Sequence, residues 1–133
     1  GVSHGYHTLS HHGQVKESIA ELSVIETFHI EQFSRFIGKL KEIKEPGGQT
    51  LLDNTMALLG SGMSNANSHS NRDLPVVMAG GGFRHGEHKH YARKGKHSTP
   101  LCNLYLSMLQ NFGLKLDRFN TSNGTLTGFE KLS

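Results

Sequence analysis

TMALLG, residues 55–60, is the first of two apolar runs that set the fold class, and LPVVMA, residues 74–79, is the second. Neither run alternates apolar with polar residues, and the second leads into three glycines. Runs that are apolar on both faces, follow a helix and end in glycine are typical of buried strands in a parallel sheet. Pro75 suits the first position of its strand, where it removes no ladder hydrogen bond. We therefore predict an α/β fold in which helices pack on a small, mainly parallel sheet.

The segment between the two runs, residues 61–73, is polar and rich in serine and asparagine. It should form a loop at the carboxyl end of the first strand, which is where open α/β sheets bind ligands. The glycines at 80–82 lack the spacing of a nucleotide-binding loop, so they indicate a tight turn that leaves the second strand.

Two helices are expected around these strands. Apolar residues recur at three- and four-residue steps over residues 14–45, and charged residues fill the other face. This pattern predicts one long amphipathic helix, or two with a kink near Gly38, ended by Pro46. Such a helix needs more partner surface than the chain supplies, which points to a missing part or to a homo-oligomer. The second helix should span residues 98–112, with a hydroxyl cap and a proline at its start, and end at Gly113.

The composition bounds the class of protein. A chain of 133 residues suits a single α/β domain over residues 1–133. Its 14 Lys and Arg exceed its 11 Asp and Glu only modestly, and the excess lies within residues 84–96 rather than in a broad basic stripe, so we expect no nucleic-acid partner. No apolar run is long enough for a membrane span. No signal peptide is visible, and the chain opens without an initiator methionine, as a tag scar or a fragment would. The tail from residue 114 should be irregular, with at most a short hairpin.

Histidines gather in the sequence HTLSHHG that begins at His7. His7 and His11 are four apart and share a face on a helical turn, whereas His12 must point elsewhere. His69, in the loop after the first strand, could join them. Three or four converging imidazoles suit zinc or a similar divalent ion. The alternative is a polar loop ahead of the helix, with Ser10 as a cap, because only a closed ligand set is specific.

A second histidine group lies in the basic segment after the glycines and comprises His85, His88, His90 and His97. A pair such as His88 and His90 points to one side of an extended segment and could chelate a metal. A solvated basic loop is the preferred interpretation. If the loop is functional, it would hold an anionic group such as phosphate or sulfate, with Arg84, His88 and Arg93 as the anion-binding contacts.

Other reactive side chains are explained more simply as structural. Glu26 and His29 form an i, i+3 pair on the long helix, and a hydrogen-bonded core histidine is preferred there over a metal ligand. Cys102 is the single cysteine, which excludes an internal disulfide. Since it lies among apolar residues, a buried, inert thiol is expected.

The motif His7-x-x-Ser10-His11-His12 resembles the signature of the HXXSHH family of uncharacterised bacterial proteins. The resemblance extends over most of the chain. It includes LLDNT at 51–55, GSGM at 60–63, NSHSN at 67–71, LP at 74–75, AGG at 79–81, and TPL followed by Asn103 and Leu104.

That family is grouped with the alkaline phosphatase and sulfatase superfamily. The resemblance implies a large α/β sandwich that cleaves phosphate or sulfate esters at a metal site, and an exported or periplasmic location for the parent protein. It places His69 at the position of a metal-binding histidine. The chain departs from active members at Ser61-Gly62, where they carry an Asp-His pair, so the usual dimetal site cannot be assembled as it stands. The resemblance also implies a C-terminal fragment, because the amino-terminal half with the attacking hydroxyl is absent.

The leading hypothesis is a fragment of a metal-dependent phosphate- or sulfate-ester hydrolase that is inactive alone. Its divalent ion, zinc or similar, would be contacted by His7, His11, His12 and His69, and Ser10 would make a local hydrogen bond. The substrate would be an anionic small molecule or a glycan. The alternative is a non-catalytic protein on the same fold that has lost its metal site and binds a glycan or a partner.

Overall fold

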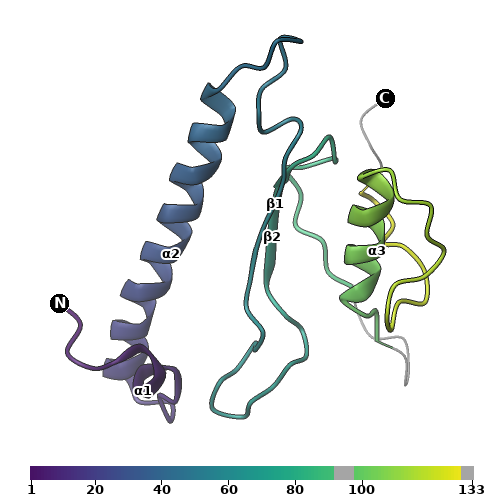
Figure 1. Ribbon diagram of the computed structural model, residues 1–133. Coiled ribbons are helices and arrows are strands. Elements are labelled where there is room, and N and C mark those ends of the chain that lie inside the picture. Colours follow the sequence, from purple (N-terminus) through teal and green to yellow (C-terminus); the bar gives the residue numbers. More distant parts are fainter. Residues whose placement is uncertain (92–97, 130–133) are drawn as a thin grey trace.

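The computed structural model describes residues 1–91 and 98–129 and shows a mixed α/β arrangement. In Figure 1 the two strands lie between the long helix on one side and the last helix on the other, and the short first helix lies at the foot of the long one. In chain order, the elements are α1 (Tyr6–Ser10), α2 (Lys16–Glu42), β1 (Met56–Gly60), β2 (Val76–Gly80) and α3 (Cys102–Asn111).

The long amphipathic helix is confirmed as one element, α2, which continues through Gly38. Its 27 residues correspond to about 40 Å at 1.5 Å per residue. The helix stops at Glu42, and the next residue, Ile43, has extended backbone. The Leu52 N–H then donates to the Leu40 carbonyl at 3.1 Å, which ties the end of α2 to the chain that enters β1.

The sheet is antiparallel, so the prediction of a mainly parallel sheet is wrong. β1 pairs with β2 in a register that sets Leu58 opposite Met78. Parallel strands need a crossover, usually a helix, and residues 61–75 contain none. This segment instead folds back on itself through a bridge between Asn65 and Ser70. The strands are also less buried than predicted, since Val77 is 48% exposed. The loop therefore joins two hairpin strands and does not lie at the edge of a parallel sheet.

The three glycines after β2 form the tight turn that the sequence predicts. Gly80, Gly81 and Gly82 have φ of 75°, 66° and 70°, a region that other residues rarely adopt. A Cβ on Gly80 would lie 2.2 Å from the Thr55 carbonyl oxygen and 2.3 Å from that of Leu52. Glycine is thus required by both conformation and space, and the turn holds β2 against the chain that precedes β1.

The helix α3 ends as predicted, since Gly113 follows it with φ of 97°. The predicted hydroxyl cap at its start is wrong, because no side chain caps the helix. The N–H groups of Asn103 and Leu104 instead donate to the carbonyls of Pro100 and Leu101, each at 3.0 Å. Tight backbone turns of this kind satisfy the first donors of a helix without a side chain.

The tail after α3 is irregular through residue 129, as predicted. It is held to α3 by Asn103, which is 5% exposed. The Asn103 side-chain amide donates to the Asn123 side chain at 2.9 Å, and the Asn123 N–H donates back to Asn103 at 3.0 Å. The Leu126 N–H also donates to the Ser107 hydroxyl at 3.1 Å. These bonds make α3 and the tail one packed unit.

Within the described residues, the hydrophobic core takes one or two side chains each from α1, α2, β1, the turn after β2, and α3. Its buried members are Leu9, Leu40, Ala57, Phe83, Leu104 and Leu106. By contrast, α2 leaves large apolar side chains in solvent, among them Val24 at 57% and Phe28 at 55% exposure. Within residues 1–91 and 98–129, no helix combines the length and apolarity needed to cross a membrane.

Candidate functional site

The short helix α1 places His7 and His11 on one face, as their spacing predicts. The His11 N–H donates to the carbonyls of His7 and Thr8, which closes the last turn. The ring centroids of His7 and His11 lie 4.8 Å apart, edge to face. Ser10 donates its hydroxyl to the His7 carbonyl at 2.8 Å, so its predicted local hydrogen bond is confirmed. Leu9 is 1% exposed and anchors this turn.

The loop between β1 and β2 brings His69 to the same place. Ser64 and Ser70 close this loop by a backbone hydrogen bond of 2.9 Å, and the His69 N–H donates to the Ala66 carbonyl at 3.2 Å. His69 has a left-handed backbone, with φ of 48°. Its ring centroid lies 5.0 Å from that of His11, with the ring planes 87° apart. The ring of His11 therefore contacts rings from both α1 and the loop.

His12 has different partners from this trio. Asn67 Nδ2 lies 3.2 Å from each of its ring nitrogens, and the Gln14 N–H donates to its Nδ1 at 3.1 Å. Asn67 also accepts the Gly13 N–H at 3.0 Å. Sequence reasoning did not single out Asn67, and its place two residues before His69 was the signal that could have found it.

The ring nitrogens of His7, His11 and His69 make no hydrogen bond within the described part of the chain, and all three side chains are exposed. Neutral imidazoles with unengaged lone pairs are the donors that zinc and similar ions take. We call these three residues the histidine cluster. Their donor atoms are of the type that binds a divalent ion. The rings meet edge to face, however, and among residues 1–91 and 98–129 no three His, Cys, Asp or Glu are placed around one metal position. Binding would require the exposed rings to rotate.

Of the three predicted anion-binding contacts, the structure describes Arg84 and His88. Arg84 forms an ion pair with Glu87 within its own loop, and Lys89 pairs with the same carboxylate at 2.7 Å. The hydrogen bond from Lys89 and the charge of Arg84 lower the pKa of Glu87. His88 is exposed, and Arg93 lies outside the described residues. Arg84 and Lys89 thus share one carboxylate, which offsets only part of their charge.

Of the other histidines after β2, His85 makes a hydrogen bond with the backbone. His85 Nε2 lies 2.8 Å from the Gly80 carbonyl, and because a carbonyl only accepts, this ring nitrogen donates. His90 is exposed, and His97 lies outside the described residues. His85 therefore supports the glycine turn at the end of β2.

The pair on α2 is not buried. Glu26 and His29 are both exposed, and the His29 ring contacts the ring of Tyr6 with centroids 5.7 Å apart. The prediction of a core histidine is wrong because this side of α2 lies in solvent. Cys102 is half-buried, and the Thr121 hydroxyl donates to its sulfur at 3.2 Å.

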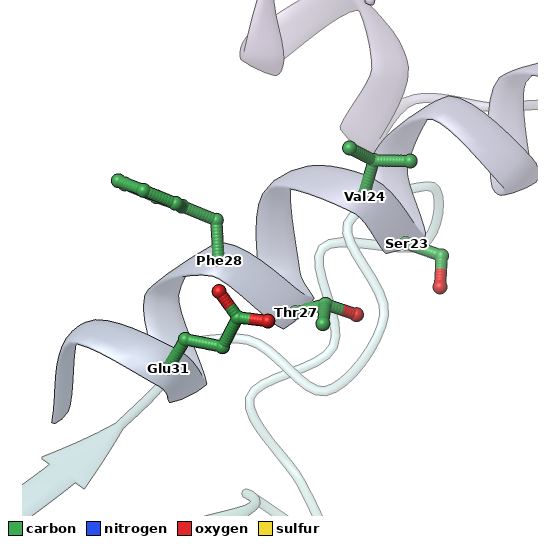
Figure 2. A pocket seen from close by; sticks show the side chains of 5 residues that line it. All are labelled: Ser23, Val24, Thr27, Phe28 and Glu31. Atoms are coloured by element: carbon green, nitrogen blue, oxygen red, sulfur yellow. The ribbon is translucent and has the colours of Figure 1, made fainter. Parts of the chain in front are cut away.

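Two surface hollows lie apart from the histidine cluster. The first is an open depression on α2, and Figure 2 shows the Phe28 side chain standing away from the helix beside it. Its lining is Ser23, Val24, Thr27, Phe28 and Glu31. The second lies beside the glycine turn and is lined in part by Asp53, Gly81 and Asn111. Neither lining contains a histidine.

The chain is thus a mixed α/β protein with a surface cluster of histidines contributed by two segments. No family model, no curated protein and no solved structure matches it. The resemblance to the HXXSHH family rests on the motifs quoted above and stays a prediction.

Proposed function

We propose that His7, His11 and His69 bind a divalent metal ion, zinc or similar, in a phosphate- or sulfate-ester hydrolase of the alkaline phosphatase type. One observation carries the proposal. The ring of His11 lies 4.8 Å from that of His7 and 5.0 Å from that of His69, although His69 belongs to a different segment of the chain. Three unengaged imidazoles from two segments are the minimum that a zinc site of the three-histidine type needs.

The backbone around the cluster supports this proposal. His69 keeps a left-handed conformation, which costs a non-glycine residue about 1–3 kcal/mol. The hydrogen bonds of the loop from Ser64 to Ser70 hold it there. His69 is the last residue of the turn between the bridged residues Asn65 and Ser70. The loop thus accepts a backbone strain at the residue that completes the cluster.

The chemistry assigned to the chain follows from these donors. When bound, a divalent ion supplies a Lewis acid for the ester oxygen. His7 and His11 would hold it from α1, and His69 would hold it from the loop. Because all three side chains are exposed, the site is open to an anionic small molecule or a glycan ester.

Zinc binding tests the proposal, measured by equilibrium dialysis on the wild type and on His69→Ala. His4→Ala is the matched control, since it removes an exposed histidine outside the cluster. We expect stoichiometric zinc in the wild type and the control, and its loss in His69→Ala. Because the fragment is expected to be inactive alone, zinc-dependent binding of inorganic phosphate or sulfate, rather than hydrolysis, then assigns the ester class. A wild type that stays metal-free with zinc or manganese supplied would overturn the proposal and favour the non-catalytic alternative.

A further inference from the structure

We propose that Asn67 is a positioning residue: its side-chain amide joins the two segments that carry the histidine cluster, and beside it the Gln14 N–H fixes the ring of His12 in one tautomer. Asn67 and His12 are both half-buried, unlike the exposed histidines beside them. The Asn67 side chain contacts the segment after α1 at two points. Its Oδ1 accepts the Gly13 N–H at 3.0 Å, and its Nδ2 lies 3.2 Å from each ring nitrogen of His12.

The orientation of the Asn67 amide follows from the first contact. A backbone N–H can only donate, so the oxygen of the amide must face Gly13. The NH₂ group then faces the ring of His12. Asn67 is therefore a donor toward His12.

The tautomer of His12 follows from its donors. The Gln14 N–H points at Nδ1 from 3.1 Å, whereas Asn67 Nδ2 lies 3.2 Å from both Nδ1 and Nε2 and does not distinguish them. A ring nitrogen that accepts the Gln14 N–H carries a lone pair and no hydrogen. Neutral His12 then carries its proton on Nε2. Its Nδ1 lone pair is engaged and its Nε2 is an N–H donor, so we leave His12 out of the proposed ligand set; that His12 contacts the metal stays a prediction. His12 offers a hydrogen bond to an acceptor such as an ester oxygen.

The place of Asn67 in the chain gives it a second effect. Gly13 lies two residues after His11, and Asn67 lies two residues before His69. The Asn67 contacts thus tie together the two segments whose rings meet at 5.0 Å. This consequence rests on the proposed function, because its readout is metal affinity, whereas the tautomer of His12 is a property of the metal-free protein.

The tautomer is tested by ¹⁵N NMR of the histidine rings in the metal-free chain, since the two ring nitrogens shift differently when protonated. We expect the Nε2–H form for His12 in the wild type. Asn67→Ala leaves the Gln14 N–H in place, so it should keep the Nε2–H form. Asn71→Ala, at an exposed asparagine of the same loop, should change nothing. A wild-type His12 protonated on Nδ1 would overturn the assignment of the tautomer.

Zinc titration tests the second effect. Removing a partner that orients metal ligands typically costs 10- to 100-fold in metal affinity, so Asn67→Ala should weaken zinc binding by about tenfold or more while Asn71→Ala leaves it unchanged. Equal affinity of Asn67→Ala and the wild type would overturn the positioning role. If the wild type shows the expected tautomer and binds no zinc, the proposed function fails and the assignment of His12 stands.

Discussion

Replacing Gly80 with alanine should unfold the end of the hairpin, because the new Cβ meets backbone rather than flexible side chain. It would lie 2.3 Å from the Leu52 carbonyl oxygen and 2.2 Å from that of Thr55. The Leu52 carbonyl accepts two hydrogen bonds, from the Thr55 N–H at 3.1 Å and the Gly81 N–H at 3.2 Å. Moving this carbonyl away from the Cβ breaks both.

The size of the effect follows from two terms. A non-glycine residue in a left-handed conformation costs about 1–3 kcal/mol, and two backbone hydrogen bonds at roughly 1 kcal/mol each add about 2 kcal/mol. Gly86→Ala isolates the first term, since Gly86 has φ of 86° and an added Cβ there meets nothing within 4 Å. Gly80→Ala should therefore destabilise the chain by about 2 kcal/mol more than Gly86→Ala.

The assay is urea unfolding followed by circular dichroism, with both variants and the wild type under the same conditions. Gly81→Ala is a graded comparison, because the Cβ there would meet the Met56 side chain, at 2.3 Å from its Cγ. That side chain can move, so the loss should fall between those of the other two variants. Equal free energies of unfolding for Gly80→Ala and Gly86→Ala would refute the reasoning.

Three further outcomes are expected. Hydrogen bonds from Ser3, with a smaller contribution from His4, lower the pKa of Glu21 from 4.5 to about 2. The stability that these bonds contribute is present above pH 4.5 and is lost as the pH falls toward 2. The protection of the Ser3 amide against hydrogen exchange should therefore fall over that range in the wild type and not in Glu21→Gln. Asn103→Ala should cost about 1–3 kcal/mol, because it removes two hydrogen bonds between Asn103 and Asn123 of the tail, at roughly 0.5–1.5 kcal/mol each, and urea unfolding measures it. The exposed apolar surface of α2 should drive self-association, so Phe28→Ser should raise the monomer fraction in sedimentation, and a wild type that is strictly monomeric contradicts this.

Local patterns predicted much of the fold because they report local physics. The three- and four-residue period gave α2, and Gly113 gave the end of α3. The strands were expected where they lie, at residues 56–60 and 76–80, and the glycines after them form the expected turn. Each of these features depends on residues within a few positions of one another.

The direction of the sheet could not be predicted in this way. An apolar run predicts a strand that is buried on both faces, yet Val77 of β2 is half exposed. The apolar composition of the run therefore did not determine how deeply the strand is buried. Pairing was decided by residues 61–75, which fold back through Asn65 and Ser70. That hairpin rests on specific hydrogen bonds within the loop, and the polar composition that predicted a loop says nothing of its path.

In the candidate site too, local features could be predicted and contacts between distant segments could not. The shared face of His7 and His11 followed from their spacing, whereas the approach of His69 to His11 depends on how the hairpin loop meets α1. The role of Asn67 depends on the same meeting. Contacts between segments far apart in the chain carry no period, so His69 was suggested beforehand only by its place in the loop after the first strand and by the resemblance to a family.

The proposal that two segments share one metal ion is tested most directly by a double-mutant cycle on zinc affinity. His11→Ala, His69→Ala and the double variant are titrated beside the wild type. If both imidazoles hold the same ion, each single variant should lose most of the affinity and the double variant should lose little more, giving a strong coupling between the two positions. Single losses that simply add, or singles that bind zinc as the wild type does, would contradict the shared site.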